Sequence, residues 1–185
     1  MKELLISSIL TALVLTIALL SVGQSRQIMP TIENPRIVIE KKNRSLKIFD
    51  GERLIKKYKI ALGLAAKGDK EIEGDGKTPE GKFYVFTKNA ESKFYLSLGL
   101  SYPNVEAATR GLREKIISPE EHDAIVKAIA EKRMPPQKTA LGGEIYIHGG
   151  GIETDWTQGC VALRNEDMQE IFEAIPVGAE VKIEN

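Results

Sequence analysis

The middle of the chain alternates apolar and polar residues in short runs. The clearest runs cover residues 36–40, 45–49 and 54–62, and each contains β-branched or aromatic residues. A period of two is typical of strands that bury one face. Asp50-Gly51 lies between the second and third runs, and this dipeptide is a strong signal for a tight hairpin turn. We therefore predict an antiparallel meander of three strands.

Further strands and two helical segments complete a mainly β, α+β fold. The additional strands are expected over residues 83–87, 94–98, 144–148, 159–163 and 179–183. Residues 105–133 are predicted to be helical, because Ser118, Pro119 and Glu121 match the start of a capped helix. Asn165 is predicted to cap a final helix. Since the helical block interrupts a series of strands, we expect it to be an insertion or a lid.

The N-terminal segment differs from the rest of the chain. Residues 4–22 carry no charge, and as a helix they would nearly span a bilayer core of about 30 Å. We expect a signal peptide or a membrane anchor over residues 1–23, which would place the remainder in the periplasm or cell envelope. Residues 24–35 are polar, contain two prolines and are expected to form a linker. Residues 36–185 suffice for one domain.

Charge and cysteine content exclude several classes of function. The 26 basic and 26 acidic residues give zero net charge, which argues against a nucleic-acid partner bound by bulk electrostatics. A single cysteine, Cys160, excludes a disulfide framework within the chain and a multi-thiolate zinc site. The loop at 74–78 lacks the helix that a phosphate loop needs, and residues 69–80 match a calcium loop only in part. Cys160 is therefore an idle buried residue, half of an intermolecular bridge or a working thiol.

The surroundings of Cys160 suit nucleophilic catalysis. An apolar run ends in His148, three glycines follow, and Gly159-Cys160 comes twelve residues after the histidine. This spacing allows the chain to turn and return beside the strand, so that the imidazole can take the proton of the thiol. The alternatives are a cysteine that is merely buried and a metal site of His148 with Glu153 and Asp155.

The segment around these residues resembles the L,D-transpeptidase catalytic domain of the YkuD type. Within that family it is similar to members that carry Asp-Trp-Thr before the cysteine motif. The matching motifs are His148-Gly149, Asp155-Trp156-Thr157, Gln158-Gly159-Cys160, Thr78-Pro79-Glu80-Gly81-Lys82-Phe83, Tyr95-Leu96-Ser97 and Ser101-Tyr102-Pro103-Asn104. The resemblance covers roughly residues 36–185, and it implies β-sandwich or barrel-like sheets with a cleft beside the helical block.

The resemblance also implies a peptidoglycan-remodelling enzyme that needs no metal or organic cofactor. Cys160 would attack a tetrapeptide stem, with His148 as its base, releasing D-alanine and passing the stem from a thioester to an amine acceptor. Water as the acceptor would make the protein an L,D-carboxypeptidase. Outside the enzymes, the alternatives are a non-catalytic cell-wall binding module and a membrane-tethered interaction protein that uses the helices of 105–133.

Further residues receive roles from the same resemblance. Gly159 and Cys160 would hold the oxyanion through backbone N–H groups, and the carbonyl of Gly149 would orient the imidazole. Expected substrate contacts are Thr157, Trp156, Arg164 and Tyr102, and Thr157 has the alternative role of tying the turn together. The chain departs from many members in having Gln158 in place of histidine and Ala162 in place of arginine.

Overall fold

The computed structural model describes residues 29–185. The apolar segment 4–22 and the expected signal peptide or anchor lie outside the described residues. No helix within residues 29–185 is both long enough and apolar enough to cross a membrane.

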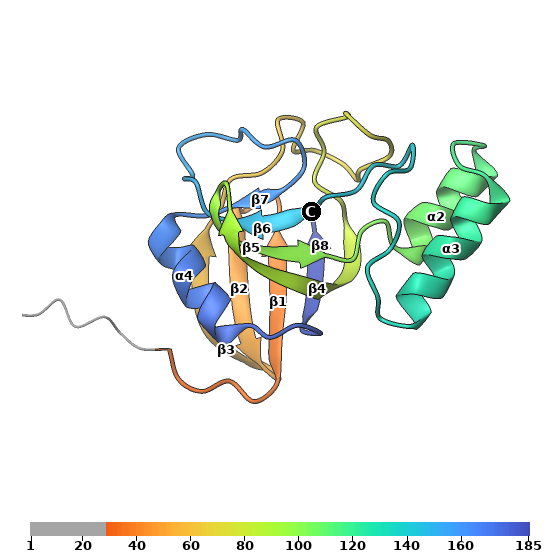
Figure 1. The fold of residues 1–185 in the computed structure, drawn as a ribbon. Coiled ribbons are helices and arrows are strands. Elements are labelled where there is room, and N and C mark those ends of the chain that lie inside the picture. The colour runs from red at the N-terminus through yellow and green to blue at the C-terminus, as the bar shows by residue number, and fades with distance from the viewer. Residues whose placement is uncertain (1–28) are drawn as a thin grey trace, which may run out of the picture. The chain divides into compact units, whose positions relative to one another are not determined.

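Eight strands of the described chain form one mixed sheet (Figure 1). Their order is β3-β2-β1-β8-β4-β5-β6-β7. The predicted meander is confirmed, because β2 pairs antiparallel with both β1 and β3. The strands are β1 (Pro35–Glu40), β2 (Ser45–Asp50), β3 (Arg53–Lys59), β4 (Gly81–Ser92), β5 (Tyr95–Leu100), β6 (Tyr146–His148), β7 (Val161–Ala162) and β8 (Glu180–Glu184).

The sheet curls until its two edges meet. The C-terminal strand β8 enters between β1 and β4, parallel to the first and antiparallel to the second. Beyond β3, Ala61 exchanges two hydrogen bonds of 2.9 Å with Ala162 in β7. Buried and exposed residues alternate along β8, where Val181 and Ile183 are buried and Glu180 and Lys182 are exposed. The expected barrel-like, mainly β class is therefore confirmed.

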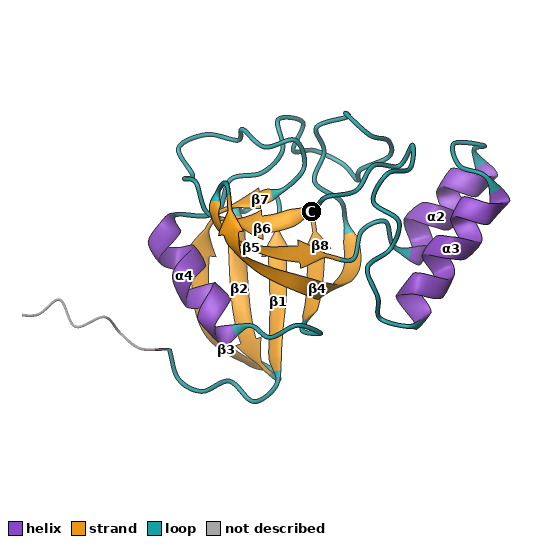
Figure 2. Cartoon of the chain, in the orientation of Figure 1, coloured by secondary structure: helices purple, strands orange, loops and turns teal. Residues whose placement is uncertain are grey.

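Three helices of the described residues lie outside the sheet (Figure 2). The predicted helical block divides into α2 (Val105–Arg113) and α3 (Pro119–Ala130), because residues 114–118 form a turn. The capping box at Ser118 and Glu121 is confirmed, with both reciprocal bonds present. The two helices pack together around a small apolar cluster of Ala108, Ile117, Ile125 and Leu141.

The start of the last helix, α4 (Asn165–Ala174), differs from its predicted form. Arg164 occupies the N-cap position and makes no capping hydrogen bond through its side chain. Asn165 is the first helical residue, and its side-chain oxygen accepts a hydrogen bond from the N–H of Gly150 at 2.9 Å. The prediction that Asn165 caps the helix is wrong because this side chain instead holds the glycine turn after β6.

Candidate active site

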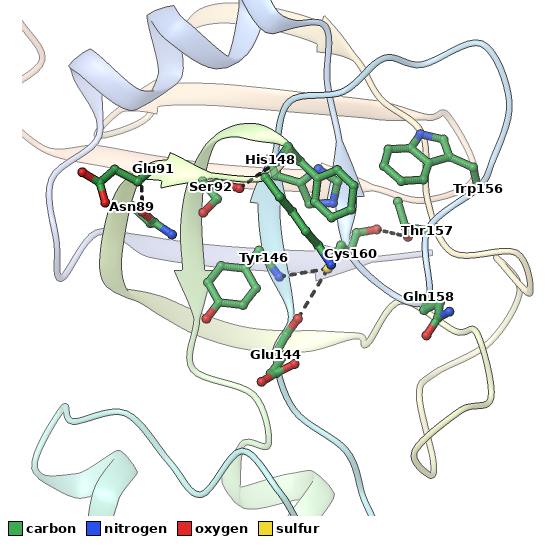
Figure 3. Close-up of a pocket in the computed structure, with 13 residues that line it drawn as sticks. Asn89, Glu91, Ser92, Glu144, Tyr146, His148, Trp156, Thr157, Gln158 and Cys160 are labelled. Atoms are coloured by element: carbon green, nitrogen blue, oxygen red, sulfur yellow. Dashed lines mark hydrogen bonds between the residues drawn. The ribbon is translucent and has the colours of Figure 1, made fainter.

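Strands β6 and β7 bring the histidine and the cysteine together. They pair in parallel, with Ile147 opposite Val161 and His148 opposite Ala162. Cys160 directly precedes β7, and the N–H of Tyr146 in β6 donates to its Sγ at 3.4 Å. Side chains two residues apart on a strand share a face, so Tyr146 and His148 point to the same side. Figure 3 shows His148 and Cys160 at one cavity.

That cavity has a volume of about 700 Å³. Its wall comes from the β4–β5 hairpin on one side and from the segment between β6 and β7 on the other. Four of the predicted site residues line it, and these are Cys160, His148, Trp156 and Thr157. The structure thus gathers the thiol, the imidazole and two expected substrate contacts around one space.

The imidazole of His148 has a defined orientation. Its Nδ1 lies 2.6 Å from the carbonyl oxygen of Gly149. Because a carbonyl only accepts, Nδ1 donates the hydrogen, and Nε2 keeps the lone pair that a base needs. Phe94 stacks on the ring with centroids 4.7 Å apart, and Trp156 meets it edge-on at 5.5 Å. Burial lowers the pKa of His148, which keeps the imidazole neutral near neutral pH.

The thiol of Cys160 is also neutral in this arrangement. Burial raises its pKa, and this outweighs the hydrogen bond from the Tyr146 N–H, which acts in the opposite direction. The thiol donates to the carbonyl of Glu144, with Sγ and oxygen 3.4 Å apart. Cys160 therefore needs a base to become a nucleophile, and His148 lies at the same cavity.

The turn before the cysteine is tied by Thr157. Its hydroxyl donates to the Cys160 carbonyl at 2.8 Å and accepts from the Gly159 N–H at 3.2 Å. Gly159 has φ +127°, and a Cβ there would lie 2.7 Å from the carbonyl oxygen of Lys77, so only glycine fits. Because the Gly159 N–H is already bonded, the Cys160 N–H is the remaining donor of the expected oxyanion pair.

The loop between His148 and Cys160 is anchored by Asp155. Its carboxylate accepts from Nε of Arg44 at 3.0 Å and from the Leu62 N–H at 2.9 Å. Burial alone would raise the pKa of Asp155, but these hydrogen bonds outweigh it and lower the pKa. Asp155 is thus a partner of Arg44, which argues against the alternative of a metal site that includes this carboxylate.

Comparison with known proteins identifies the family of this chain. The family model for the L,D-transpeptidase catalytic domain, YkuD, matches residues 34–183. The chain belongs to the YkuD family. YafK of Escherichia coli (strain K12) is 25% identical over 146 residues, which are 75% of this chain and 46% of YafK. The chain thus spans about half the length of the curated relatives it matches.

Solved structures share the YkuD fold. The helical cell shape determining protein Pgp2 from Campylobacter jejuni is 24% identical with a TM-score of 0.58, and the match covers 88% of this chain and 52% of Pgp2. Bd1075 of Bdellovibrio bacteriovorus is 22% identical with a TM-score of 0.54, covering 85% of this chain and 51% of Bd1075. At these identities the likeness concerns the fold.

A second cavity of this YkuD domain also reaches the cysteine. It has a volume of about 560 Å³ and shares Glu144, Gln158 and Cys160 with the first. Its other walls are the loops at 70–74 and 137–145. No residue of 105–133 lines either cavity, and Figure 1 draws α2 and α3 to one side of the sheet. Of the two alternatives, an insertion or a lid, this arrangement favours an insertion.

Two expected substrate contacts lie away from both cavities. Tyr102 is 1% exposed, and its hydroxyl donates to the carbonyl of Leu141 at 3.1 Å, so it is a core residue. Arg164 is an exposed residue at the start of α4. Neither residue lines a cavity that holds Cys160. Their positions in this YkuD domain do not support a role in binding substrate.

Several cavity residues had no signal in the sequence. Phe94 lies in the turn between β4 and β5, although the alternating pattern predicts it in a strand. Its neighbour Lys93 lines the cavity, and so do Tyr146 and Glu144 near the cysteine. Lys93 and Phe94 form a two-residue turn because Ser92 at the end of β4 pairs with Tyr95 at the start of β5, and this register is known only from the fold.

Proposed function

We propose that the chain is a peptidoglycan-remodelling L,D-transpeptidase that forms a thioester between Cys160 and a tetrapeptide stem. One observation carries this proposal. The thiol of Cys160 lines a cavity together with an imidazole whose Nδ1 hydrogen is held by the Gly149 carbonyl. That hydrogen bond leaves Nε2 as the base, which is the arrangement that thiol acyl transfer requires.

In the acylation step, Nε2 of His148 takes the proton of Cys160 as Sγ attacks the carbonyl of the third stem residue. The carbonyl π electrons move to oxygen, and the N–H of Cys160 stabilises the oxyanion. The intermediate collapses as the C–N bond breaks, and the imidazolium gives its proton to the departing nitrogen of D-alanine. A thioester and a neutral imidazole remain.

In the transfer step, an amine of a second stem attacks the thioester. His148 takes a proton from the amine, the C–S bond breaks, and the thiolate recovers the proton from the imidazolium. The second cavity supports transfer, because it offers a route to Cys160 that differs from the cavity holding the donor stem. Water in place of the amine would give L,D-carboxypeptidase activity by the same thioester.

The proposed setting is the cell envelope, where peptidoglycan stems are the partners. Residues 4–22 would direct the chain there as a signal peptide or anchor it to the membrane. One protein of the same fold, Pgp2, is named as a determinant of helical cell shape. We therefore propose cell shape as the phenotype to follow when the gene is deleted.

The deciding experiment is mass spectrometry of the purified full chain mixed with tetrapeptide muropeptides. A Cys160→Ala protein is the control. We expect a thioester on Cys160 and crosslinked dimers as product. A thioester that yields only tripeptide would make the enzyme a carboxypeptidase, and neither adduct nor product would favour a cell-wall binding module.

A further inference from the structure

Within the described residues, the charged side chains that line the main cavity are Lys93, Glu91 and Glu144. Lys93 is the one basic residue among them, and no arginine of the described chain lines this cavity. Since burial keeps His148 neutral near neutral pH, Lys93 supplies the positive charge of this site. The glutamates would repel an anionic ligand, so Lys93 determines where a carboxylate can bind.

The β4–β5 hairpin holds Lys93 beside the reacting pair. Lys93 and Phe94 are the two residues between β4 and β5. Nζ of Lys93 lies 5.0 Å from the ring centroid of Phe94, and the same ring stacks on His148. Burial has the largest effect on the pKa of both Cys160 and His148, and the charge of Lys93 acts on both in the lowering direction, which agrees with an ammonium group close to both.

This ammonium group has no protein counter-ion within residues 29–185. No ion pair of the described chain includes Lys93, although its side chain is exposed. Lys70, which lines the second cavity, differs in this respect because Asp75 binds it at 2.8 Å. Lys93 is therefore the cation that can pair with a ligand at the main cavity.

The proposed substrate presents a carboxylate at the corresponding place. The bond that Cys160 would cleave joins the third stem residue to a terminal D-alanine. The carboxylate of that alanine is separated from the departing nitrogen by a single carbon. The charge of Lys93 acts on both Sγ of Cys160 and the imidazole of His148. Lys93 is therefore close to the position that this carboxylate must occupy during the reaction.

We propose that Lys93 binds the terminal carboxylate of the donor stem and so restricts the enzyme to stems with a free C-terminus. This inference rests on the proposed function and names the specificity of the same site. Stems also carry carboxylates at earlier residues, so the experiment must separate these from the terminal group.

The test compares two tetrapeptides that differ only at the C-terminus, one with a free carboxylate and one with a carboxamide. For the full chain, kcat/KM for acylation of Cys160 is expected to be at least about tenfold higher for the carboxylate, as charged hydrogen bonds typically give. Lys93→Gln should remove this preference by raising KM for the carboxylate peptide. Lys93→Arg should retain most of the preference. Lys42→Gln, at an exposed lysine in the β1–β2 turn, is the matched control.

Binding measurements make the test independent of the chemistry. In a Cys160→Ala background, calorimetry should give a Kd about tenfold lower for the carboxylate peptide, and Lys93→Gln should abolish that difference. Equal losses of affinity for both peptides would overturn the proposal. Lys93 would then act on the Cys160 thiol or on the stability of the fold. A carboxylate preference that survives Lys93→Gln would transfer the role to another residue. Lack of acylation of Cys160 by either peptide, with the binding difference intact, would overturn the proposed function alone.

Discussion

At the residue scale, His148 and Cys160 form a neutral pair at rest. Burial lowers the pKa of the imidazole and raises the pKa of the thiol, so a proton moves only when a substrate arrives. This differs from a preformed thiolate–imidazolium pair, in which the thiol titrates well below its ordinary range. The two cases predict different pH profiles for the rate at which the Cys160 thiol is alkylated.

We predict that iodoacetamide alkylation of Cys160 becomes faster with rising pH and continues to do so beyond the ordinary thiol pKa, without a plateau near neutral pH. The reason is that the raised pKa delays thiolate formation. Acylation by substrate should persist into mild acid and fall only below the lowered pKa of His148, where the base becomes protonated. Stopped assays followed by mass spectrometry measure both rates. An alkylation plateau at neutral pH would contradict the neutral pair.

The predicted site residues that the structure brings together and those that it places elsewhere differ in a physical way. Cys160 and His148 stand in a short motif whose two ends a parallel strand pair brings together. Tyr102 belongs to a Ser-Tyr-Pro-Asn turn that suggests a surface position, but its ring is buried and its hydroxyl is satisfied by Leu141. Whether a turn is buried depends on the segments that pack over it, and the local sequence pattern carries no information about those segments.

At the scale of elements, the loop between β6 and β7 depends on a contact with the β1–β2 turn. Arg44 and the Leu62 N–H together hold Asp155, the residue before Trp156. Trp156 in turn contacts Phe94 and the imidazole of His148. The position of the His148 ring therefore rests on a carboxylate that lines neither cavity.

We predict that Asp155→Asn lowers the free energy of unfolding by about 1–2 kcal/mol and slows acylation about tenfold. Chemical denaturation and the mass-spectrometric acylation assay measure the two effects. The pKa of Asp155 is lowered, so its contribution is complete above the ordinary carboxyl pKa and is lost only as pH falls through the lowered value. Wild-type protein should therefore keep this contribution at pH 5. Glu153→Gln, at an exposed residue of the same loop, is the control and should change neither quantity.

The strands were largely predictable because alternation of buried and exposed side chains is a local property. The β4–β5 hairpin was less predictable. Tyr95 adopts φ +77° directly after the turn, and an aromatic residue, which favours strands, does not indicate such a conformation. The cap of α4 was also missed, because the side chain of Asn165 is used by the distant Gly150. At Asn165 a tertiary contact overrides the local preference.

At the scale of the whole molecule, the strand order could not be read from the sequence. Strand β8 enters beside β1, and the bridge between Ala61 and Ala162 closes the curled sheet. These are contacts between residues far apart in the chain. They matter for function because closure places β7, and with it Cys160, against the segment that follows β3.

The helical insertion is also connected to the site, although it lines neither cavity. Arg110 in α2 donates to the carboxylate of Asp69 at 2.7 Å and to the carbonyl of Lys70. Asp69 also accepts from the Glu80 N–H at 2.7 Å, while Lys70 lines the second cavity. The helices thus support the loop on the side of Cys160 where we propose that the acceptor enters.

We predict that Arg110→Leu slows transfer of the acyl group to an amine more than it slows acylation. The ratio of crosslinked to hydrolysed product should fall by about fivefold, which corresponds to about 1 kcal/mol. Quantitative chromatography of the muropeptides measures this ratio, and circular dichroism checks the fold. Arg113→Leu on the same helix is the control, because Arg113 is exposed and its ion-pair partner within the described chain is the neighbouring Glu114. Equal slowing of acylation and transfer would mean that the insertion supports the domain as a whole and has no particular effect on the acceptor side.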